Sequence, residues 1–364
     1  MRKTIRLFRK KIKHAKMVVG FMLNKKSFLS QPSYYDEDKR KSNLRITFEI
    51  ICHIWKYGEV NQFYYAYGLD QKGRKSDGYM AYSDFMEKRN KRNYTRPFDY
   101  LCILRDKNIF SIVAEAFHIP SPLNLCTLCN GSFLSQQANF SEKDLWKDTD
   151  SLFVKAITGE CGQKVLNIKY QNGGGYLINN TFAPSWRHVK DYLSSDEFKN
   201  VEFVVQKCLK NHPVIDRIYP QSINTIRLVT IKNPKTNKVE PFAAILRIGA
   251  HGHSVDNWAM GGLAIKINND GTLAPEAYYK PGYGTKTKTH PDTDILFENI
   301  KVPHFDECIH LCCKYHEKLA IHSIGWDVAI TIEGPVIIEG NDNWEISLMQ
   351  VPCGPLQSAF INTL

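Results

Sequence analysis

The chain has 364 residues, with 48 Lys and Arg against 37 Asp and Glu, 43% hydrophobic and 12% aromatic residues. This composition excludes a disordered, a collagen-like and a coiled-coil protein, and the length allows two or three domains with a substantial core. The longest uncharged apolar run near the N-terminus, Met17–Leu23, is too short to cross a bilayer. We therefore expect a soluble, globular protein.

The net charge of +11 is concentrated at the N-terminus. Residues 1–26 hold ten Lys and Arg and no acid, which leaves 38 basic against 37 acidic residues elsewhere. The body is thus nearly neutral, which argues against a nucleic-acid groove. The tail has an apolar stripe at helical spacing, formed by Ile5, Phe8, Ile12, Ala15, Val19 and Met22. It predicts a basic amphipathic helix over 1–26, which either lies on an anionic membrane surface or packs on the body through that stripe.

The ten cysteines form no regular framework. Cys126 and Cys129 have zinc-like spacing, but no second pair completes a site, and nothing in the sequence joins Cys308 to Cys312 or Cys313. Free thiols in a reducing cytoplasm are the better interpretation.

The first predicted element after the tail is a helix over Asp38–Tyr57, which presents Leu44, Phe48, Ile51 and Trp55 on one face and stops at Gly58. Residues 68–97 are polar and weakly periodic, so they predict a loop-rich connector, and 27–99 forms a helical cap region. A further helix over Asp106–Phe117 ends at the breaker 119–122.

From residue 150 onward short apolar or alternating runs predict strands. The predicted strands are Leu152–Ile157, Val165–Tyr170, Glu202–Leu209, Ile226–Lys232, Phe242–Ile248, Ile324–Ile332 and Val336–Glu339. One helix, Phe305–Leu319, interrupts them. The fold class is α+β with antiparallel hairpins.

The last hairpin carries the sharpest chemical signal. If residues 333–335 form a three-residue loop, Asp327 faces Asn341, and Glu339 lies on the same side of the sheet. These three side chains would supply the oxygen ligands that Mg²⁺ prefers. The alternative is an ordinary polar sheet face, but charges inside apolar strands are seldom buried without a partner.

Two weaker signals indicate phosphate binding. Lys155 ends a strand and precedes the glycine loop 159–164, where backbone N–H groups can close over an anion. Arg227 and Arg247 lie in apolar strands, and Gly261-Gly262 follows Arg247. Each feature alone is equally compatible with a hairpin turn or a structural ion pair.

In this order the motifs resemble those of ATP-grasp proteins such as D-alanine–D-alanine ligases and ribosomal-protein glutamate ligases. The stretches 222–230, 246–249, 324–330 and 339–341 are more similar to the sugar-transfer associated ATP-grasp group, which is associated with bacterial exopolysaccharide and capsule assembly. The resemblance covers about 100–364. It implies two α+β subdomains that sandwich ATP, with a glycine-loop lid at about 150–207 and a metal and phosphate subdomain at 208–364.

The resemblance also implies roles for single residues. ATP would be bound by Lys107, Lys155, Gly159, Gly162, Lys164, Gln206, Lys207 and Leu209, with Asp216 at the ribose. The phosphoryl group would be held by Arg247, Asn257 and Arg227, and one or two Mg²⁺ by Asp327, Glu339 and Asn341. Gln206 departs from the pattern, since an acid is frequent there.

The function that follows is a cytoplasmic carboxylate–amine ligase that uses ATP and Mg²⁺ to form an amide through an acyl phosphate. Its substrates would be a carboxylated sugar or glycan precursor and an amino acid or amine, and the basic tail would hold it at the inner membrane face. Two alternatives remain: a kinase for a sugar or polyol hydroxyl, and a non-catalytic scaffold that binds polyanions or membranes.

Overall fold

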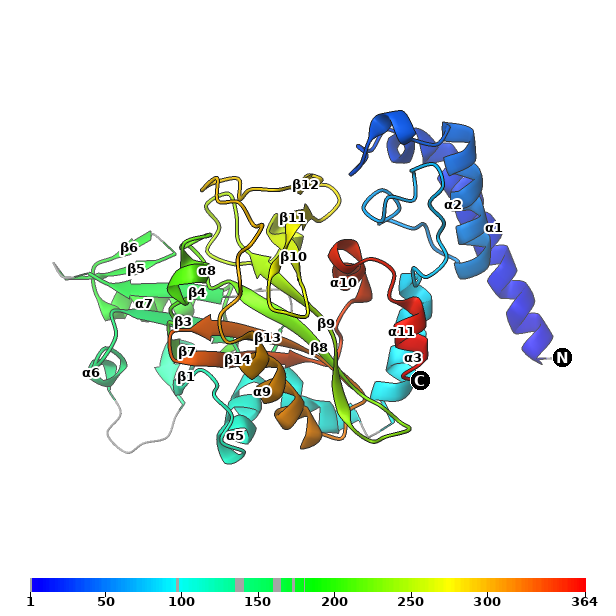
Figure 1. The fold of residues 1–364 in the computed structure, drawn as a ribbon. Coiled ribbons are helices and arrows are strands. Elements are labelled where there is room, and N and C mark those ends of the chain that lie inside the picture. Colours follow the sequence, from blue (N-terminus) through cyan, green and yellow to red (C-terminus); the bar gives the residue numbers. More distant parts are fainter. Residues whose placement is uncertain (1, 96–97, 135–140, 160–164, 172–173, 180) are drawn as a thin grey trace.

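The computed structural model describes residues 2–95, 98–134, 141–159, 165–171, 174–179 and 181–364. They form two seven-stranded sheets and a helical N-terminal region (Figure 1). Helices and antiparallel sheets are therefore combined in an α+β fold, as expected. No helix within these ranges has the length and hydropathy to span a membrane.

The N-terminal region begins with α1 (Arg2–Leu29), so the basic segment is helical as predicted and extends three residues further. Helix α2 (Asn43–Tyr57) starts later than the predicted Asp38, because Ser42 provides its N-cap by accepting a hydrogen bond from the Arg45 N–H. It ends as predicted at Gly58, which has the left-handed φ of 78°. Short 3₁₀ turns occupy Glu37–Lys39, Phe98–Leu101 and Trp258–Met260.

The expected connector 68–97 contains a helix that the sequence analysis missed, α3 (Tyr82–Asn93). Its sequence is too polar to show an apolar stripe, since its buried face combines Phe85 with the polar Arg89 and Asn93. The next elements are α4 (Cys102–Arg105) and α5 (Lys107–Ala116). Helix α5 confirms the predicted helix, with Asp106 as its N-cap.

The first sheet has the strand order β2-β1-β7-β3-β4-β5-β6. Its strands are β1 (Asn124–Cys129), β2 (Ser132–Phe133), β3 (Ser151–Ala156), β4 (Val165–Tyr170), β5 (Tyr176–Ile178), β6 (Thr181–Ala183) and β7 (Glu202–Lys207). Helices α6 (Glu142–Leu145) and α7 (Trp186–Leu193) accompany it. Because the sheet includes β1 and β2, it begins well before residue 150.

The second sheet has the order β12-β11-β10-β9-β8-β13-β14. Its strands are β8 (Thr225–Lys232), β9 (Val239–Ile248), β10 (Leu263–Ile267), β11 (Leu273–Tyr279), β12 (Lys286–Thr287), β13 (Ser323–Thr331) and β14 (Gly334–Asn341). The helices around it are α8 (Pro213–Asp216), α9 (Phe305–Glu317), α10 (Ile346–Cys353) and α11 (Gln357–Ile361).

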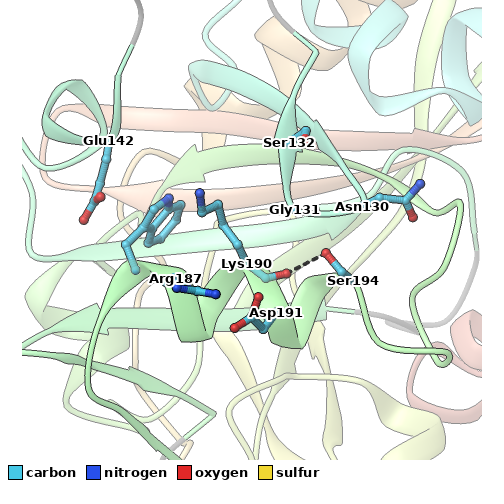
Figure 2. A pocket seen from close by; sticks show the side chains of 9 residues that line it. Asn130, Gly131, Ser132, Glu142, Arg187, Lys190, Asp191 and Ser194 are labelled. Carbon is cyan, nitrogen blue, oxygen red and sulfur yellow. Dashed lines mark hydrogen bonds between the residues drawn. The ribbon is translucent and has the colours of Figure 1, made fainter.

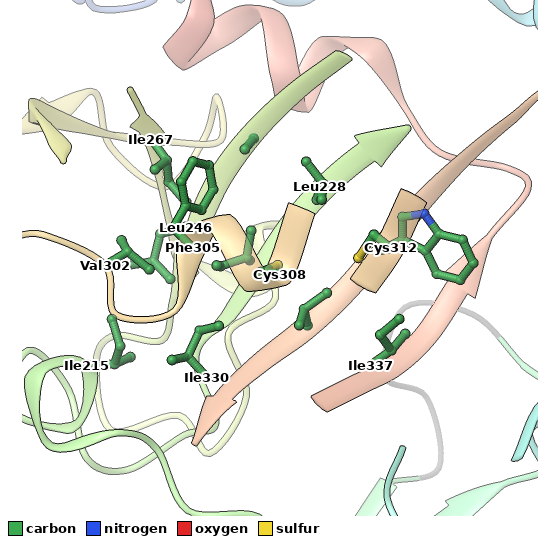
Figure 3. Packing of buried hydrophobic residues seen from close by; sticks show 14 of the residues in the cluster. Ile215, Leu228, Leu246, Ile267, Val302, Phe305, Cys308, Cys312, Ile330 and Ile337 are labelled. Carbon is green, nitrogen blue, oxygen red and sulfur yellow. The ribbon is translucent and has the colours of Figure 1, made fainter. Parts of the chain in front are cut away.

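Both faces of the second sheet are buried. On one face, α9 packs Cys308 and Cys312 into a core with Ile330 (Figure 3). On the other face, Val229 and Ile245 belong to a core shared with the N-terminal region and α10. The near-continuous apolar sequence of β8 and β13 follows from this double burial.

Candidate functional site

The candidate site is built on the β13–β14 hairpin, whose register differs from the predicted one. Thr331 pairs with Gly334 across a two-residue turn, not a three-residue loop. A bulge between Asp327 and Val328 then shifts the pairing, so Asp327 lies opposite Glu339, not opposite Asn341. A bulge inserts an unpaired residue, which strict alternation along the sequence does not reveal.

The shifted register still gathers the three predicted oxygen donors. Asn341, paired with Gly325, donates its Nδ2 to the Gly325 carbonyl at 3.3 Å and to Glu339 Oε1 at 3.4 Å. Because the amide nitrogen makes both bonds, the amide oxygen is the atom that a cation would contact. Asp327, Glu339 and Asn341 thus share one end of the hairpin.

Two arginines from neighbouring strands clamp Asp327. Arg227 on β8 binds it through Nε and Nη2, the latter at 3.0 Å, and Nη2 of Arg247 on β9 lies 3.0 Å from its Oδ2. Burial would raise the pKa of Asp327, but the two guanidinium groups lower it to about 2. Asp327 is therefore ionised at neutral pH.

Arg247 is itself fixed by further partners. It donates to Thr225 Oγ1 at 2.7 Å and lies 3.4 Å from Asp256. Its orientation is thus set by β8, by β13 and by the loop after β9, and a guanidinium held in this way is suited to binding a phosphoryl oxygen.

Two lysines lie near enough to this hairpin to affect the pKa of Glu339. Lys155 extends from β3 of the first sheet, and Lys107 begins α5 and donates to the Gly159 carbonyl at 3.3 Å. Burial and the nearby Lys107 charge lower the pKa of Lys155, while Glu339 raises it. The Lys155 ammonium and the Glu339 carboxylate are thus near enough for each charge to shift the pKa of the other group.

Glu339 carries the least compensated charge of the site. Burial and the Asp327 carboxylate raise its pKa, and Lys107 and Lys155 lower it only in part. A divalent cation between Glu339, Asp327 and the Asn341 oxygen would relieve this repulsion, so the donor set fits Mg²⁺. An anion beside Lys107 and Lys155 would likewise relieve the repulsion between the two ammonium groups, so these lysines are suited to a phosphate.

The predicted adenine residues lie on and after β7. Gln206 is buried and donates its Nε2 to Asn124 Oδ1 at 2.7 Å, so its amide is fixed by β1. Lys207 lies 3.4 Å from Asp148, Leu209 is half-buried, and Asp216 accepts a 3.4 Å bond from Asn211. None of these contacts assigns adenine or ribose binding, so these roles stay predictions.

The loop between β9 and β10 positions Asn257 close to Arg247. The Asn257 side chain accepts from the Ala259 N–H at 2.9 Å, and its carbonyl accepts from the Gly262 N–H at 3.2 Å. A Cβ on Gly262 would meet the Asp256 carbonyl at 2.9 Å and the Ile248 carbonyl at 3.0 Å, so only glycine allows this close turn. Gly162 and Lys164 of the predicted glycine loop lie outside the described residues.

The sequence analysis missed the residues that hold the chain just after Asn341. Arg105 on α4 forms a bidentate ion pair with buried Asp342, at 2.9 and 2.7 Å. Asn93 on α3 donates to the Asp342 carbonyl at 2.9 Å, and Arg89 contacts Asn343 Oδ1 at 2.5 Å. In the sequence, the position of Asp342 directly after Asn341 was the one feature that could have indicated an ion pair here.

Other candidate sites are less convincing. A surface cavity of about 440 Å³ lies between the β1–β2 turn and α7, but its lining, which includes Arg187, Lys190 and Asp191, contains none of the site residues (Figure 2). Cys126 and Cys129 are free thiols on β1. In the described ranges no three His, Cys, Asp or Glu gather as a metal site.

The geometry agrees with a comparison against family models. Residues 83–359 match the model of the sugar-transfer associated ATP-grasp family. The chain belongs to this family. The family assignment confirms the ATP-grasp fold that the sequence motifs suggested, and the matched region begins within α3, so the missed helix belongs to it.

Solved structures with a similar fold include ATP-grasp ligases. The D-alanine–D-alanine ligase from Coxiella burnetii is 13% identical, with a TM-score of 0.37 over 72% of this chain and 58% of that one. D-alanyl-alanine synthetase A from Vibrio cholerae is 12% identical, with a TM-score of 0.38 over 71% and 61%. A RimK domain ATP-grasp protein from Sphaerobacter thermophilus is 12% identical, with a TM-score of 0.37 over 71% and 69%. The chain thus spans less than two thirds of either of the first two proteins, and no curated protein matches it.

Proposed function

We propose that this protein is an ATP- and Mg²⁺-dependent carboxylate–amine ligase. The observation that carries the proposal is the cluster of Lys107, Lys155, Arg227 and Arg247 around Asp327 and Glu339, with groups from both sheets. Such a cluster suits a triphosphate and its metal, because cations neutralise the phosphate oxygens and carboxylates hold the ion. A scaffold has no need of this arrangement.

The reaction would proceed in two steps. A substrate carboxylate oxygen attacks the γ-phosphorus of ATP, the bond to the β-phosphate oxygen breaks, and an acyl phosphate and ADP form. An amine then attacks the acyl carbon, inorganic phosphate leaves with the bonding electron pair, and the amine proton passes to a base, giving an amide.

The residues of the chain would contribute position and charge rather than a nucleophile. Lys107 and Lys155 would bind the phosphates of ATP, and Arg247 would hold the transferring group. Mg²⁺ bound by Asp327, Glu339 and Asn341 would neutralise charge on the phosphate oxygens. Arg227, paired with Asp327, would keep that carboxylate ionised and oriented.

The proposed substrate class rests on the family description. "Sugar-transfer associated" supports a sugar or glycan precursor as one substrate. That this precursor carries the carboxylate, that an amino acid or amine is the second substrate, and that the product serves exopolysaccharide or capsule biosynthesis are parts of the proposal. A sugar or polyol kinase would use the same phosphate site and differ only in its product, a phosphoester without an amide.

The test is substrate-dependent ADP release, followed by product identification by mass spectrometry. With a panel of uronic acids and amines we expect ADP, phosphate and an amide in equal amounts, whereas a phosphoester would identify the kinase. Glu339→Gln should lower turnover by about 10³-fold, because it removes a carboxylate that would hold the Mg²⁺ beside the transferring phosphate. Glu333→Gln, at the exposed tip of the same hairpin, is the matched control. Turnover that survives in Glu339→Gln would refute the metal assignment.

A further inference from the structure

Helix α1 leaves the described part of its predicted apolar stripe, from Ile12 onward, exposed to solvent. It packs inward through the heptad-spaced His14, Phe21 and Phe28, which are all buried. The outward side chains are 43% exposed at Ile12, 59% at Val19, 39% at Met22 and 80% at Leu23. The described part of the stripe therefore does not dock the helix on the body, contrary to that alternative.

Helix α2 shows the same inversion. Its buried face is Ile46, Ile50 and Ile54. Of the predicted face, Leu44 is 84%, Phe48 58% and Trp55 49% exposed, and Ile51 is half-buried. Several large apolar side chains on two adjacent helices thus face water. Single exposed apolar residues are normal on a protein surface, but a group of them indicates an interaction surface.

The two helices are joined along a common seam. Near one end, the Lys11 ammonium lies 4.8 Å from the centre of the Trp55 ring and donates to the Trp55 carbonyl at 3.0 Å. At the other end, Lys25 and Lys26 line a shallow groove together with Asn43, which precedes Leu44. Helices α1 and α2 therefore pack against each other, and Figure 1 shows the pair at the end of the molecule opposite the first sheet.

The charge of this hairpin is predominantly positive. Residues 1–35 contain no acid, and Lys10, Lys13, Lys16 and Lys26 of α1 are exposed. The single acid of α2, Glu49, is neutralised by Lys41 at 2.9 Å and Arg45 at 2.7 Å. Exposed apolar side chains are thus flanked by several lysines, and among the described residues no salt bridge to Lys10, Lys13, Lys16 or Lys26 is found.

We propose that the outer face of the α1–α2 hairpin docks on an anionic lipid bilayer, with both helices in the headgroup plane. Leu23, Val19 and Phe48 would enter the acyl boundary, and the lysines would reach the lipid phosphates while their stems stay in apolar surroundings. A bilayer suits this face better than an acidic protein, because exposed apolar side chains run along both helices and are flanked by lysines, a pattern that matches an extended anionic surface with an apolar interior. This role is independent of ATP and of the proposed reaction.

The first test is vesicle co-sedimentation of the full chain. We expect binding to vesicles of phosphatidylcholine and phosphatidylglycerol, at least about tenfold weaker binding to phosphatidylcholine alone, and weakening by salt. Leu23→Glu and Val19→Glu should each lower the affinity about tenfold, since each places a charge in the apolar boundary. Leu296→Glu, an identical change at a residue 59% exposed on the body, is the matched control. Far-UV circular dichroism checks that each variant folds.

The second test uses Trp55, the most exposed of the six tryptophans. Its emission should shift to the blue on addition of anionic vesicles, and Trp55→Phe should lose the shift but keep the binding. The proposal is overturned if anionic vesicles do not bind, if Leu23→Glu binds like the control, or if the wild type forms a dimer through this face and ignores vesicles.

Discussion

At the scale of single residues, Asp342 connects the candidate metal ligands to the N-terminal helices. Its carboxylate is buried and paired with Arg105, which is partly exposed on α4. Removing one partner of such a pair leaves an uncompensated buried charge, which costs more than the pair contributes. The pair therefore fixes the position of Asn341, its neighbour in the chain.

We predict that Arg105→Gln lowers the free energy of unfolding by about 2–4 kcal/mol. Arg105→Gln with Asp342→Asn should be less destabilised than the sum of the single variants, because the double variant no longer buries an unpaired charge. Urea unfolding measures this cycle, and Arg45→Gln, in a surface pair, should change the free energy by only about 0.5 kcal/mol. Additive single effects would contradict the prediction.

His316 makes the fold sensitive to acid. Its Nε2 lies 2.9 Å from the Ile321 carbonyl and its Nδ1 2.7 Å from Thr230 Oγ1, which also accepts from Trp326 Nε1. The neutral ring thus donates through Nε2 and accepts through Nδ1. Burial lowers the pKa of His316 from 6.5 to about 4.

Because the folded pKa lies below the unfolded one, the unfolded state takes up the proton first as the pH falls. The free energy of unfolding should therefore decrease by about 1.4 kcal/mol per pH unit between about 6.5 and 4 through this residue. His316→Gln should flatten that dependence in urea titrations at several pH values. His310→Gln, on the exposed side of the same helix, should leave the slope unchanged, and a slope equal in both variants would refute the assignment.

At the scale of elements, the sequence predicted where helices and strands lie along the chain better than it predicted which of their faces is buried. Helices α5 and α9 and the β8–β9 hairpin follow from caps, breakers and alternation, which are local signals. The prediction of which face of α2 is buried was wrong because both sides of the helix are apolar. Only contact with the rest of the chain determines that the isoleucine face is the buried one. The bulge in β14 is likewise set by pairing with β13. The sequence therefore predicted the right three metal ligands but paired Asp327 with the wrong residue of β14.

The face of α2 can be tested by a pair of truncations. Ile50→Ala should lower the free energy of unfolding by about 2–4 kcal/mol, because it opens a cavity in a fully buried position. Phe48→Ala removes a larger side chain but should cost only about 0.5 kcal/mol, since that side chain is exposed. Chemical unfolding of the two variants measures the difference, and the reverse order would restore the face predicted from the sequence.

At the scale of the whole molecule, the N-terminal region and the second sheet share one core. The Phe63 ring stacks on Trp258 with centroids 6.0 Å apart, and the Tyr34 hydroxyl donates to the Tyr279 carbonyl at 3.0 Å. Gln350 of α10 donates to the Tyr67 hydroxyl at 3.1 Å. A core that is continuous across this boundary should not melt in parts.

We therefore predict one calorimetric transition for the N-terminal region and the second sheet. Phe63→Ala should lower the midpoint of that single peak, with a loss of about 3 kcal/mol, because it opens a cavity between the two regions. Phe182→Ala, which truncates an exposed side chain of the first sheet, is the matched control.

The same transition should respond to nucleotide. Mg²⁺ with ATP, at about 100 times the dissociation constant, should stabilise it by about 2.7 kcal/mol, and Mg²⁺ alone or ATP alone should stabilise it less. A second peak that ATP does not move would show that the N-terminal helices fold separately from the nucleotide site, and that Phe63 contacts the body without coupling to it.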